Sequence, residues 1–145
     1  MLVSAGRWIS ISAVKFKITL LKAFSIFDRR GEIYCFHIVD PNEPGFLLKI
    51  GRTSRPLEQR KAEWALQCPS RLQLWYEGVA VDHSHRVERL VHLALMSDGV
   101  ERVLERCRDC GKVHQEIFRF HRADAWDKVV KPLILDVDAR VEGRN

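Results

Sequence analysis

The hydrophobic positions in the first half of the chain predict a β-hairpin. Residues 31–40 (GEIYCFHIVD) and 46–51 (FLLKIG) are rich in β-branched and aromatic side chains, which favour strands. The PNEPG segment between them holds two prolines, an asparagine and a glycine, which are typical turn residues. Residues 71–81 (RLQLWYEGVAV) alternate well enough to predict a third strand, and EIFRF at 116–120 predicts a short one.

Three other segments have the spacing of helices. Residues 57–68 have few helix breakers and follow a proline, which is favoured in a first helical turn. Residues 82–96 carry an apolar stripe at helical spacing, with Asp82 or Ser84 as the expected N-cap. Residues 123–135 (ADAWDKVVKPLIL) predict a last helix, which its internal proline should kink or shorten.

The order of these elements predicts one mixed α/β (α+β) domain. We expect a small, mostly antiparallel, three-stranded sheet flanked by helices, with a cysteine-bearing insert before the last strand. A chain of 145 residues has room for one such core. The expected domain spans residues 31–136, after an N-terminal extension over 1–30 and before a C-terminal tail over 137–145.

The composition of the extension bears on location. Residues 1–27 contain four Lys/Arg, four Ser and no acidic residue, which is typical of a mitochondrial transit peptide. The alternatives are that these residues form a poorly ordered extension, or that the start of the coding sequence has been assigned too far upstream. Lysines interrupt its apolar runs, so none approaches the roughly 20 residues of a membrane span, and we expect no membrane partner. Four unevenly spaced cysteines favour reduced thiols, and hence an intracellular location. We expect the nucleus or the cytoplasm, or the mitochondrion if residues 1–27 are a transit peptide.

Positive charge is concentrated in one short segment of the expected domain. The whole chain has a formal net charge of +5, but residues 31–48 hold no cation and residues 62–145 are close to neutral. Residues 49–61 hold five cations against one acid, Glu58. Because side chains alternate along a strand, Lys49 should lie near Tyr34 if the two strands pair. The segment is therefore a candidate contact for an anion such as nucleic-acid phosphate.

Four sequence features, taken in order, resemble a known nuclease superfamily. EIYCFHI at 32–38 is followed by LKIGRT at 48–53, then by an arginine in the next helix and a glutamate in a later one. This arrangement resembles the GIY-YIG nuclease superfamily, and within it the bacteriophage Orf-172 type DNA-binding domains. A fungal group of uncharacterised domains is similar in the KIGRT stretch and in a Cys-x-x-Cys-Gly-x-x-His segment. The likeness covers about residues 31–135.

The resemblance implies roles for particular residues. Tyr34 would help to activate water, Arg60 would steady the charge that develops on phosphorus, and Glu88 would hold one divalent metal, Mg²⁺ or Mn²⁺. It also implies phosphate contacts by the KIGRT stretch and the turn after it, namely Lys49, Gly51, Arg52, Thr53, Arg55 and Lys61. DNA is the expected partner, and RNA is not excluded.

Two departures from the superfamily pattern affect the expected activity. Glu32 stands where the first glycine of the GIY motif is expected, and Lys49 stands where the second tyrosine is expected. A lysine keeps a phosphate contact but loses a hydroxyl group, which favours binding over cleavage. A DNA-binding domain is therefore the leading hypothesis. A metal-dependent endonuclease and a zinc-stabilised interaction module without nucleic-acid activity are the alternatives.

The cysteine-bearing insert has the spacing of half a zinc site. Cys107 and Cys110 are two residues apart, and His114 follows four residues later; thiolates and imidazole are the usual ligands of Zn²⁺. The alternatives are free thiols and a redox-active pair. A fourth ligand must come from elsewhere, and the candidates are Cys68, His92 and His121. The fungal domains also carry a cysteine at the position of Cys68, which makes it the preferred one.

Overall fold

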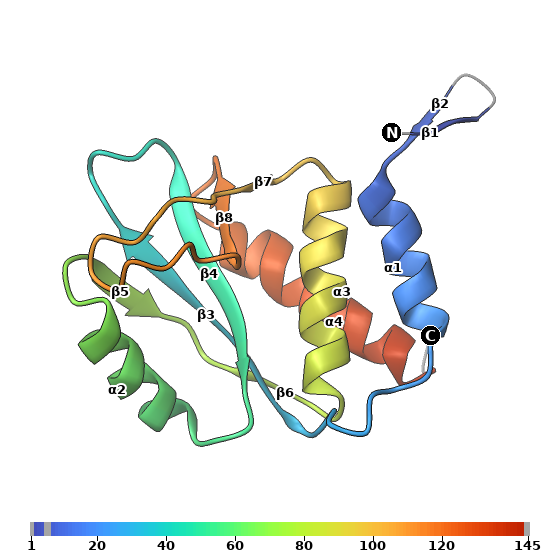
Figure 1. Ribbon diagram of the computed structural model, residues 1–145, viewed down its shortest axis with the longest axis horizontal. Helices are drawn as coiled ribbons and strands as arrows, with labels where there is room; N and C mark the ends of the chain where they lie inside the picture. The colour runs from blue at the N-terminus through green and yellow to red at the C-terminus, as the bar shows by residue number, and fades with distance from the viewer. Residues whose placement is uncertain (1, 5–6, 144–145) are drawn as a thin grey trace.

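The computed structural model describes residues 2–4 and 7–143 (Figure 1). Residues 1 and 5–6 of the expected extension, and 144–145 of the expected tail, lie outside the described residues. The strands are β1 (Leu2–Ser4), β2 (Arg7–Ile9), β3 (Gly31–Val39), β4 (Phe46–Thr53), β5 (Leu72–Trp75), β6 (Val79–Val81), β7 (Glu101–Arg102) and β8 (Ile117–Phe120). The helices are α1 (Ile11–Leu21), α2 (Leu57–Gln67), α3 (Ser84–Ser97), a π-helix (Trp126–Val130) and α4 (Lys131–Val141).

The predicted fold class is confirmed, with a larger sheet than expected. Strands β5, β3, β4, β8 and β7 lie in that order, all paired antiparallel, and β6 also pairs with β3. The segment over 71–81 breaks into two strands that pair with different parts of β3. At the break the chain runs close to β3, since a Cβ on Gly78 would lie 2.5 Å from the Glu32 carboxylate. Strands β8 and β7 extend the sheet beyond β4.

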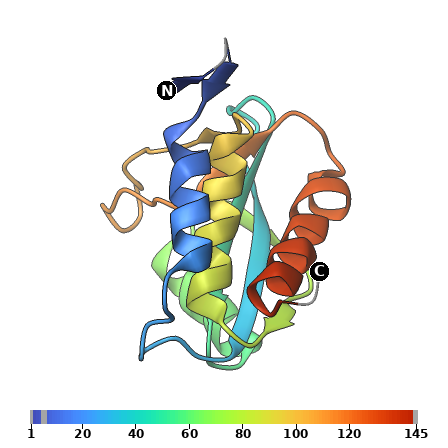
Figure 2. The same cartoon turned by 90° about the vertical axis from the view of Figure 1, so that its right-hand side faces the viewer.

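Helices cover the two faces of the sheet unequally. Figure 1 shows α2 on one side of the sheet and α3 and α4 on the other, and Figure 2 shows α1 beside α3. The larger apolar core lies between the sheet and the pair α3–α4, and it includes Phe16 of α1. A smaller cluster, in which Tyr34, Phe36 and Trp64 are the aromatic members, lies beneath α2.

The N-terminus of α3 is capped from a distance, so the predicted cap residues are wrong. The residue before α3 is His83, whose side chain makes no capping bond. Instead the Asp28 carboxylate accepts hydrogen bonds from the backbone N–H groups of His85 (2.9 Å) and Arg86 (3.1 Å). Ser84 donates from its hydroxyl to the Arg29 carbonyl at 2.7 Å. A carboxylate from outside the local sequence thus satisfies the free donors that begin every helix.

The segment before β3 also packs on α3. The guanidinium of Arg86, which is buried, donates to the carbonyl oxygens of Leu20, Lys22 and Ala23 at 2.7–3.3 Å. These carbonyls lie at the end of α1, where backbone acceptors lack helical partners. Where the domain begins stays a prediction. Within the described residues, no helix is both long and apolar enough to cross a membrane.

The C-terminal helix changes type close to its proline. Residues Trp126–Val130 form a π-helix, and α4 follows with Pro132 in its first turn. A proline has no N–H to donate and clashes with the preceding turn, so the α-helical hydrogen-bond pattern begins anew at this point. The prediction that Pro132 perturbs this helix agrees with where the change occurs. Ile134 and Val137 of α4 are buried against the sheet core.

Candidate nucleic-acid interface and metal centre

Helix α2 rests on the sheet through a single fully enclosed side chain. Trp64 is the buried residue of α2 at 5% exposure, whereas Leu66 is 85% exposed. The Trp64 ring packs edge-on against Phe36, with ring centroids 5.4 Å apart. The helix is otherwise rich in charged side chains, because most of its surface faces solvent.

Tyr34 lies beneath α2 and explains the glycine in the KIGRT stretch. Tyr34 is 1% exposed, and its cross-strand partner is Gly51. A Cβ on Gly51 would lie 2.5 Å from both Cζ and Oη of Tyr34, a distance that no Cβ can adopt without movement of its neighbour. Only glycine therefore lets the tyrosine ring lie flat across β4.

The Tyr34 hydroxyl is held by its neighbours and is hard to ionise. The indole Nε1 of Trp64 donates a hydrogen bond to Tyr34 Oη at 2.9 Å. Burial raises the pKa of Tyr34 above its ordinary value, and the hydrogen bonds from Trp64 and Arg60 oppose that rise. A tyrosine in this state is a poor general base near neutral pH.

Trp64 also lies between two of the predicted cations. The Lys49 Nζ lies 4.9 Å from the Trp64 ring centroid, and the Arg60 Cζ lies 5.0 Å from it, both within the range of a cation–π contact. Sequence reasoning did not select Trp64. The available signal was its position four residues after Arg60, which places both side chains on one face of the helix.

Lys49 is buried. The sequence did not predict this, because a lysine near the end of a strand usually faces solvent. Lys49 is 4% exposed and forms an ion pair with Glu116, next to the start of β8. Burial lowers the pKa of Lys49, and the negative charge of Glu88 opposes this. Burial raises the pKa of Glu88 in turn, while Lys49 and Arg52 lower it. The predicted residues Tyr34, Lys49, Arg60 and Glu88 are therefore close enough to influence one another.

Most of the cations predicted to form a positive cluster already have carboxylate partners. Both terminal nitrogens of Arg55 bond to Glu63, with Nη2–Oε1 at 2.8 Å, and Arg60 Nη1 reaches the same Oε1 at 3.0 Å. Lys61 pairs with Glu58 at 3.2 Å. Counting charges over 49–61 missed Glu63 and Glu116, which lie outside that window but face into it.

Arg52 and Thr53 differ from the other predicted phosphate contacts. Among the described residues, Arg52 makes its side-chain hydrogen bond to a neutral group, with Nε 3.0 Å from the hydroxyl oxygen of Ser84. The Thr53 hydroxyl accepts from the Arg55 backbone N–H at 3.1 Å and donates to the Arg55 carbonyl at 3.2 Å. Thr53 therefore shapes the turn after β4, and Arg52 keeps guanidinium donors for an anion.

His92, one candidate fourth ligand, has a different partner. Its Nε2 lies 2.9 Å from the carbonyl oxygen of Ile50, so the ring donates a proton there when neutral. Burial lowers the pKa of His92 to about 4. His121 is exposed and lies outside the cysteine cluster.

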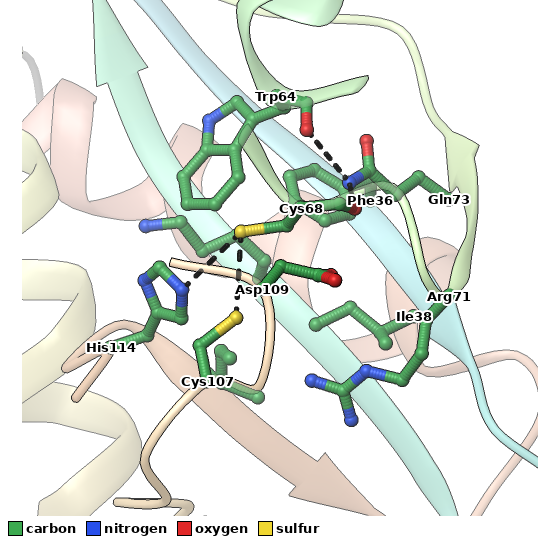
Figure 3. A pocket seen from close by; sticks show the side chains of 11 residues that line it. Phe36, Ile38, Trp64, Cys68, Arg71, Gln73, Cys107, Asp109 and His114 are labelled. Atoms are coloured by element: carbon green, nitrogen blue, oxygen red, sulfur yellow. Dashed lines mark hydrogen bonds between the residues drawn. The ribbon is translucent and has the colours of Figure 1, made fainter. Parts of the chain in front are cut away.

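The preferred ligand set comes together at the C-terminal end of α2. Cys68, which follows α2 directly, has its Sγ 3.6 Å from the Sγ of Cys107 and 3.7 Å from Nε2 of His114. The Sγ of Cys110 lies 3.4 Å from the same nitrogen, and all four ligand atoms lie within 4.8 Å of one another. Figure 3 shows Cys68, Cys107 and His114 pointing toward one another beneath Trp64.

These distances fit a tetrahedral metal ion. Two thiolates bound to one Zn²⁺ at about 2.3 Å lie about 3.8 Å apart, and a thiolate and an imidazole lie about 3.6 Å apart. Burial and the adjoining thiols Cys107 and Cys110 raise the pKa of Cys68 to about 12, and a divalent cation at the centre would favour its thiolate instead. Three thiols and one imidazole are a donor set suited to zinc. The cluster can hold such a metal.

The loops that carry the four ligands are joined to each other. The Ser70 backbone N–H and hydroxyl both donate to the Asp109 carboxylate, at 3.0 and 2.7 Å. The Gly111 N–H donates to the Cys107 carbonyl at 2.9 Å, and Gly111 has a φ of +72°, which favours glycine. The tight turn between Cys107 and His114 therefore does not depend on a metal alone.

The metal centre and the aromatic cluster meet in one small cavity. A space of about 20 Å³ is lined by Lys49 and Trp64 from one side and by Cys68, Cys107 and His114 from the other. The rings of Trp64 and His114 lie 5.3 Å apart. Helix α2 connects the two sites, since Arg60 and Trp64 lie on it and Cys68 follows its last residue.

Comparison with known proteins assigns the chain to a family. The model of the T5orf172 domain matches residues 31–134, a span that contains every predicted site residue. Searches of curated proteins and of solved structures found no match. The family is associated with nucleic acids, which agrees with the coarse prediction from the sequence. Since the matched region covers most of the chain, this protein belongs to the T5orf172 domain family.

Proposed function

We propose that this protein is a DNA-binding domain of the GIY-YIG superfamily that contacts the phosphate backbone through residues 49–61. The observation that carries the proposal is that Lys49 and Arg60 lie against the aromatic rings beneath α2, while the charge of Glu88 on α3 is close enough to act on Tyr34 and Lys49. Membership of a nucleic-acid-associated family supports it. Salt-sensitive affinity with little sequence preference is the expected behaviour.

Guanidinium groups supply the phosphate contacts in this proposal. Arg52 offers donors that no carboxylate occupies among the described residues. Arg55 and Arg60 hold the Glu63 carboxylate between them, and a phosphodiester has similar oxygen spacing and charge. Binding therefore involves exchange of Glu63 for phosphate. This competition keeps affinity moderate and makes the surface over residues 49–61 less positive in the free protein than a charge count over that segment indicates.

The surroundings of Tyr34 and Glu88, together with the lysine at position 49, favour binding without cleavage. Tyr34 is enclosed and its pKa is raised, and Lys49 occupies the expected place of the second tyrosine. The Glu88 carboxylate is already influenced by two cations, Lys49 and Arg52. These neighbours oppose binding of Mg²⁺ by Glu88, because they reduce the negative potential that attracts it.

Salt titrations of duplex affinity test the proposal. Replacing Arg52 and Arg60 with Ala should weaken binding at least about tenfold and reduce the slope of log K against log salt by about 0.9 for each lost phosphate contact. Arg122→Ala is the matched control, since that exposed arginine pairs with Asp124 at 2.6 Å outside the cluster. Unchanged affinity and slope in the double variant would refute phosphate binding by 49–61.

Glu63→Gln tests the exchange step separately. Glutamine keeps the size of the side chain but removes the charge that competes with phosphate, so affinity should rise about threefold or more. Glu58→Gln, which releases the exposed Lys61 alone, should have a smaller effect. A loss of affinity in Glu63→Gln would mean that Glu63 supports the binding conformation instead of competing with phosphate.

Metal-dependent endonuclease activity is the second candidate, because Tyr34, Arg60 and Glu88 share one site. Nicking of supercoiled plasmid with Mg²⁺ or Mn²⁺ tests it. Activity that is lost in Glu88→Ala and retained in Glu77→Ala, a control at an exposed carboxylate paired with Lys131, would establish the enzyme. Nicking that survives Glu88→Ala would exclude this site.

Structural zinc at Cys68, Cys107, Cys110 and His114 is the third part of the proposal. The residues would hold the ion with no open position, so its role is to fasten the insert to the end of α2. Elemental analysis should give one zinc per chain, retained in Cys35→Ala because Cys35 is buried elsewhere, and lost in Cys107→Ser. A zinc-loaded protein without affinity for DNA or RNA would favour the interaction-module alternative.

A further inference from the structure

Helix α1 has one covered face and one apolar face that is exposed. Phe16, at 9% exposure, and Leu20 pack against the main core on the side of α3. On the opposite side Ile11 is 55% exposed, Ile18 61% and Leu21 85%. Positions separated by seven and three residues lie on one face of a helix, so these three form a single stripe.

Cations border this stripe on both sides. At about 100° per residue, Lys15 and Lys17 fall on opposite edges of the line through Ile11 and Ile18, and both are exposed. Residues 1–27 contain no acidic side chain. The apolar stripe therefore has only positive charge beside it on its own helix.

The chain that follows α1 adds further exposed apolar and basic side chains. Ile26 is 91% exposed and Phe27 67%, and the exposed Arg29 and Arg30 follow. We call the set the α1 surface, which consists of Ile11, Lys15, Lys17, Ile18, Leu21, Lys22, Ile26, Phe27 and Arg29. Arg30 is left out because it pairs with Asp82 at 3.2 Å. These residues differ from scattered surface apolar groups, which need no explanation, because three of the apolar ones share a face of α1 and the other two follow within six residues of its end.

The rest of the fold holds this segment in place. Arg86 bonds to three carbonyls at the end of α1, and Asp28 caps α3. The Phe24 ring stacks on His83 with centroids 3.8 Å apart. The apolar side chains are thus presented on a defined backbone, which reduces the conformational entropy lost when a partner binds.

We propose that the α1 surface binds the interface of an anionic lipid bilayer. Such an interface offers both acyl chains for Ile18, Leu21 and Phe27 and negative headgroups for the bordering lysines. A second copy packed through the same surface would bring the lysines of both copies together, and residues 1–27 hold no carboxylate to pair them. A nucleic acid would match the charge but would leave the apolar stripe in water. Contact of this kind is peripheral and needs no membrane-spanning helix, so it departs from the expectation of no membrane partner, which rested on the lack of a spanning segment.

Vesicle flotation with the full chain tests the proposal. Protein should float with phosphatidylcholine vesicles that contain phosphatidylglycerol and stay in solution with phosphatidylcholine alone. Lys15→Gln with Lys17→Gln should lower the partition coefficient at least about tenfold, since each cation near an anionic surface contributes about fivefold. Ile18→Ser with Leu21→Ser should lower it by a similar factor because acyl-chain contact is lost.

Matched controls separate lipid binding from other causes. Lys128→Gln and Leu135→Ser change an exposed lysine and a half-exposed leucine elsewhere and should leave flotation unchanged. The α1 variants should keep their melting temperature, since the altered side chains are exposed. Equal flotation with neutral vesicles, no flotation at all, or flotation that the α1 variants leave unchanged would overturn the proposal. So would a dimer in light scattering that Ile18→Ser with Leu21→Ser converts to monomer.

Discussion

The two faces of the sheet are built from different kinds of contact. On the face toward α3 and α4, aliphatic and aromatic side chains such as Leu90 and Phe118 are fully enclosed, both at 0% exposure. On the face toward α2, the enclosed group mixes the aromatic rings of Tyr34, Phe36 and Trp64 with the cation of Lys49. One face therefore stabilises the fold by burying apolar side chains, and the other encloses a charged group among aromatic rings.

The difference shows how a small domain can separate stability from function. Helix α3 contributes a long apolar stripe, and its links to the candidate site are Glu88 and Ser84, which accepts a hydrogen bond from Arg52. Helix α2 has one buried residue, Trp64, and a second attachment through Cys68 at its end. We expect disturbances of the α2 face to affect binding first and those of the α3 face to affect stability first.

Metal removal should have the largest effect, and it should be confined to the α2 face. With zinc about 1,000-fold above its dissociation constant, the ion contributes about 4 kcal/mol to the free energy of local opening of the α2 face, all of which a chelator removes. Hydrogen exchange should rise in α2 and residues 106–114 while α3 stays protected. Cys35→Ala, with a chelator, should behave as the chelated wild type. If the amides of α2 exchange equally slowly with and without chelator, the metal at Cys68 does not help to hold α2 on the sheet.

A pair of substitutions, one on each face, should give opposite results. Leu90→Ala removes a fully buried side chain and should lower the free energy of unfolding by about 3 kcal/mol, with duplex affinity unchanged below the melting transition. Trp64→Phe removes the donor to Tyr34 Oη and should cost about 1 kcal/mol, yet weaken duplex affinity several-fold. Denaturant titration and fluorescence anisotropy measure the two quantities. Equal loss of affinity in both variants would remove the distinction between the faces.

Gly51→Ala should disturb the α2 face by a steric route. The added methyl group meets the Tyr34 ring at 2.5 Å, and relief of such overpacking costs about 2 kcal/mol. Tyr34→Leu removes the clashing atoms, so Gly51→Ala should cost much less in that background. A double-mutant cycle in urea measures the coupling. Additive costs would show that the ring moves away freely.

Acid should weaken the α3 face through His92. Burial lowers its pKa from the ordinary 6.5 to about 4 in the folded state, so the unfolded chain binds the proton more tightly. The associated stability is complete above about pH 6.5 and falls by about 1.4 kcal/mol per pH unit as pH drops toward 4. His92→Gln should lose this dependence, and His121→Gln should keep it. Acid can also release metal from His114. The contribution of His92 is therefore measured as the slope of the free energy of unfolding against pH in the wild type minus that in His92→Gln.

The sequence predicted the elements better than their connections. The patterns at 31–40 and 46–51 gave β3 and β4 because alternation, β-branched residues and a turn all agree there. The cap on α3 could not be predicted, since Asp28 lies more than fifty residues away in sequence from the N–H groups that it binds. The break between β5 and β6 was missed because the alternation over residues 71–81 predicts one strand, although a lone glycine within a strand pattern indicates a bulge or a close approach. At Gly78 the close approach is to the Glu32 carboxylate.

The members of the cysteine–histidine cluster were predicted from the sequence, but the charge balance around residues 49–61 was not. The Cys68 assignment is supported by distances at the cluster, where three of the ligands lie close in sequence and one lies on another element. The positive cluster over 49–61 is largely neutralised by Glu63 and Glu116, which a local count cannot show. Trp64 escaped notice because a lone helix tryptophan usually serves the core, as it does here, while also lying against Lys49 and Arg60.

Nuclear magnetic resonance titration of the zinc-loaded, ¹⁵N-labelled protein with a short DNA duplex tests the separation of the two faces most directly. Binding should shift the backbone signals of residues 49–61 and the indole Nε1 signal of Trp64, while the signals of α4 and of the buried part of α3 stay in place. Shifts confined to α4 or to the exposed strand β5, with the Trp64 indole unchanged, would contradict a nucleic-acid site on the α2 face.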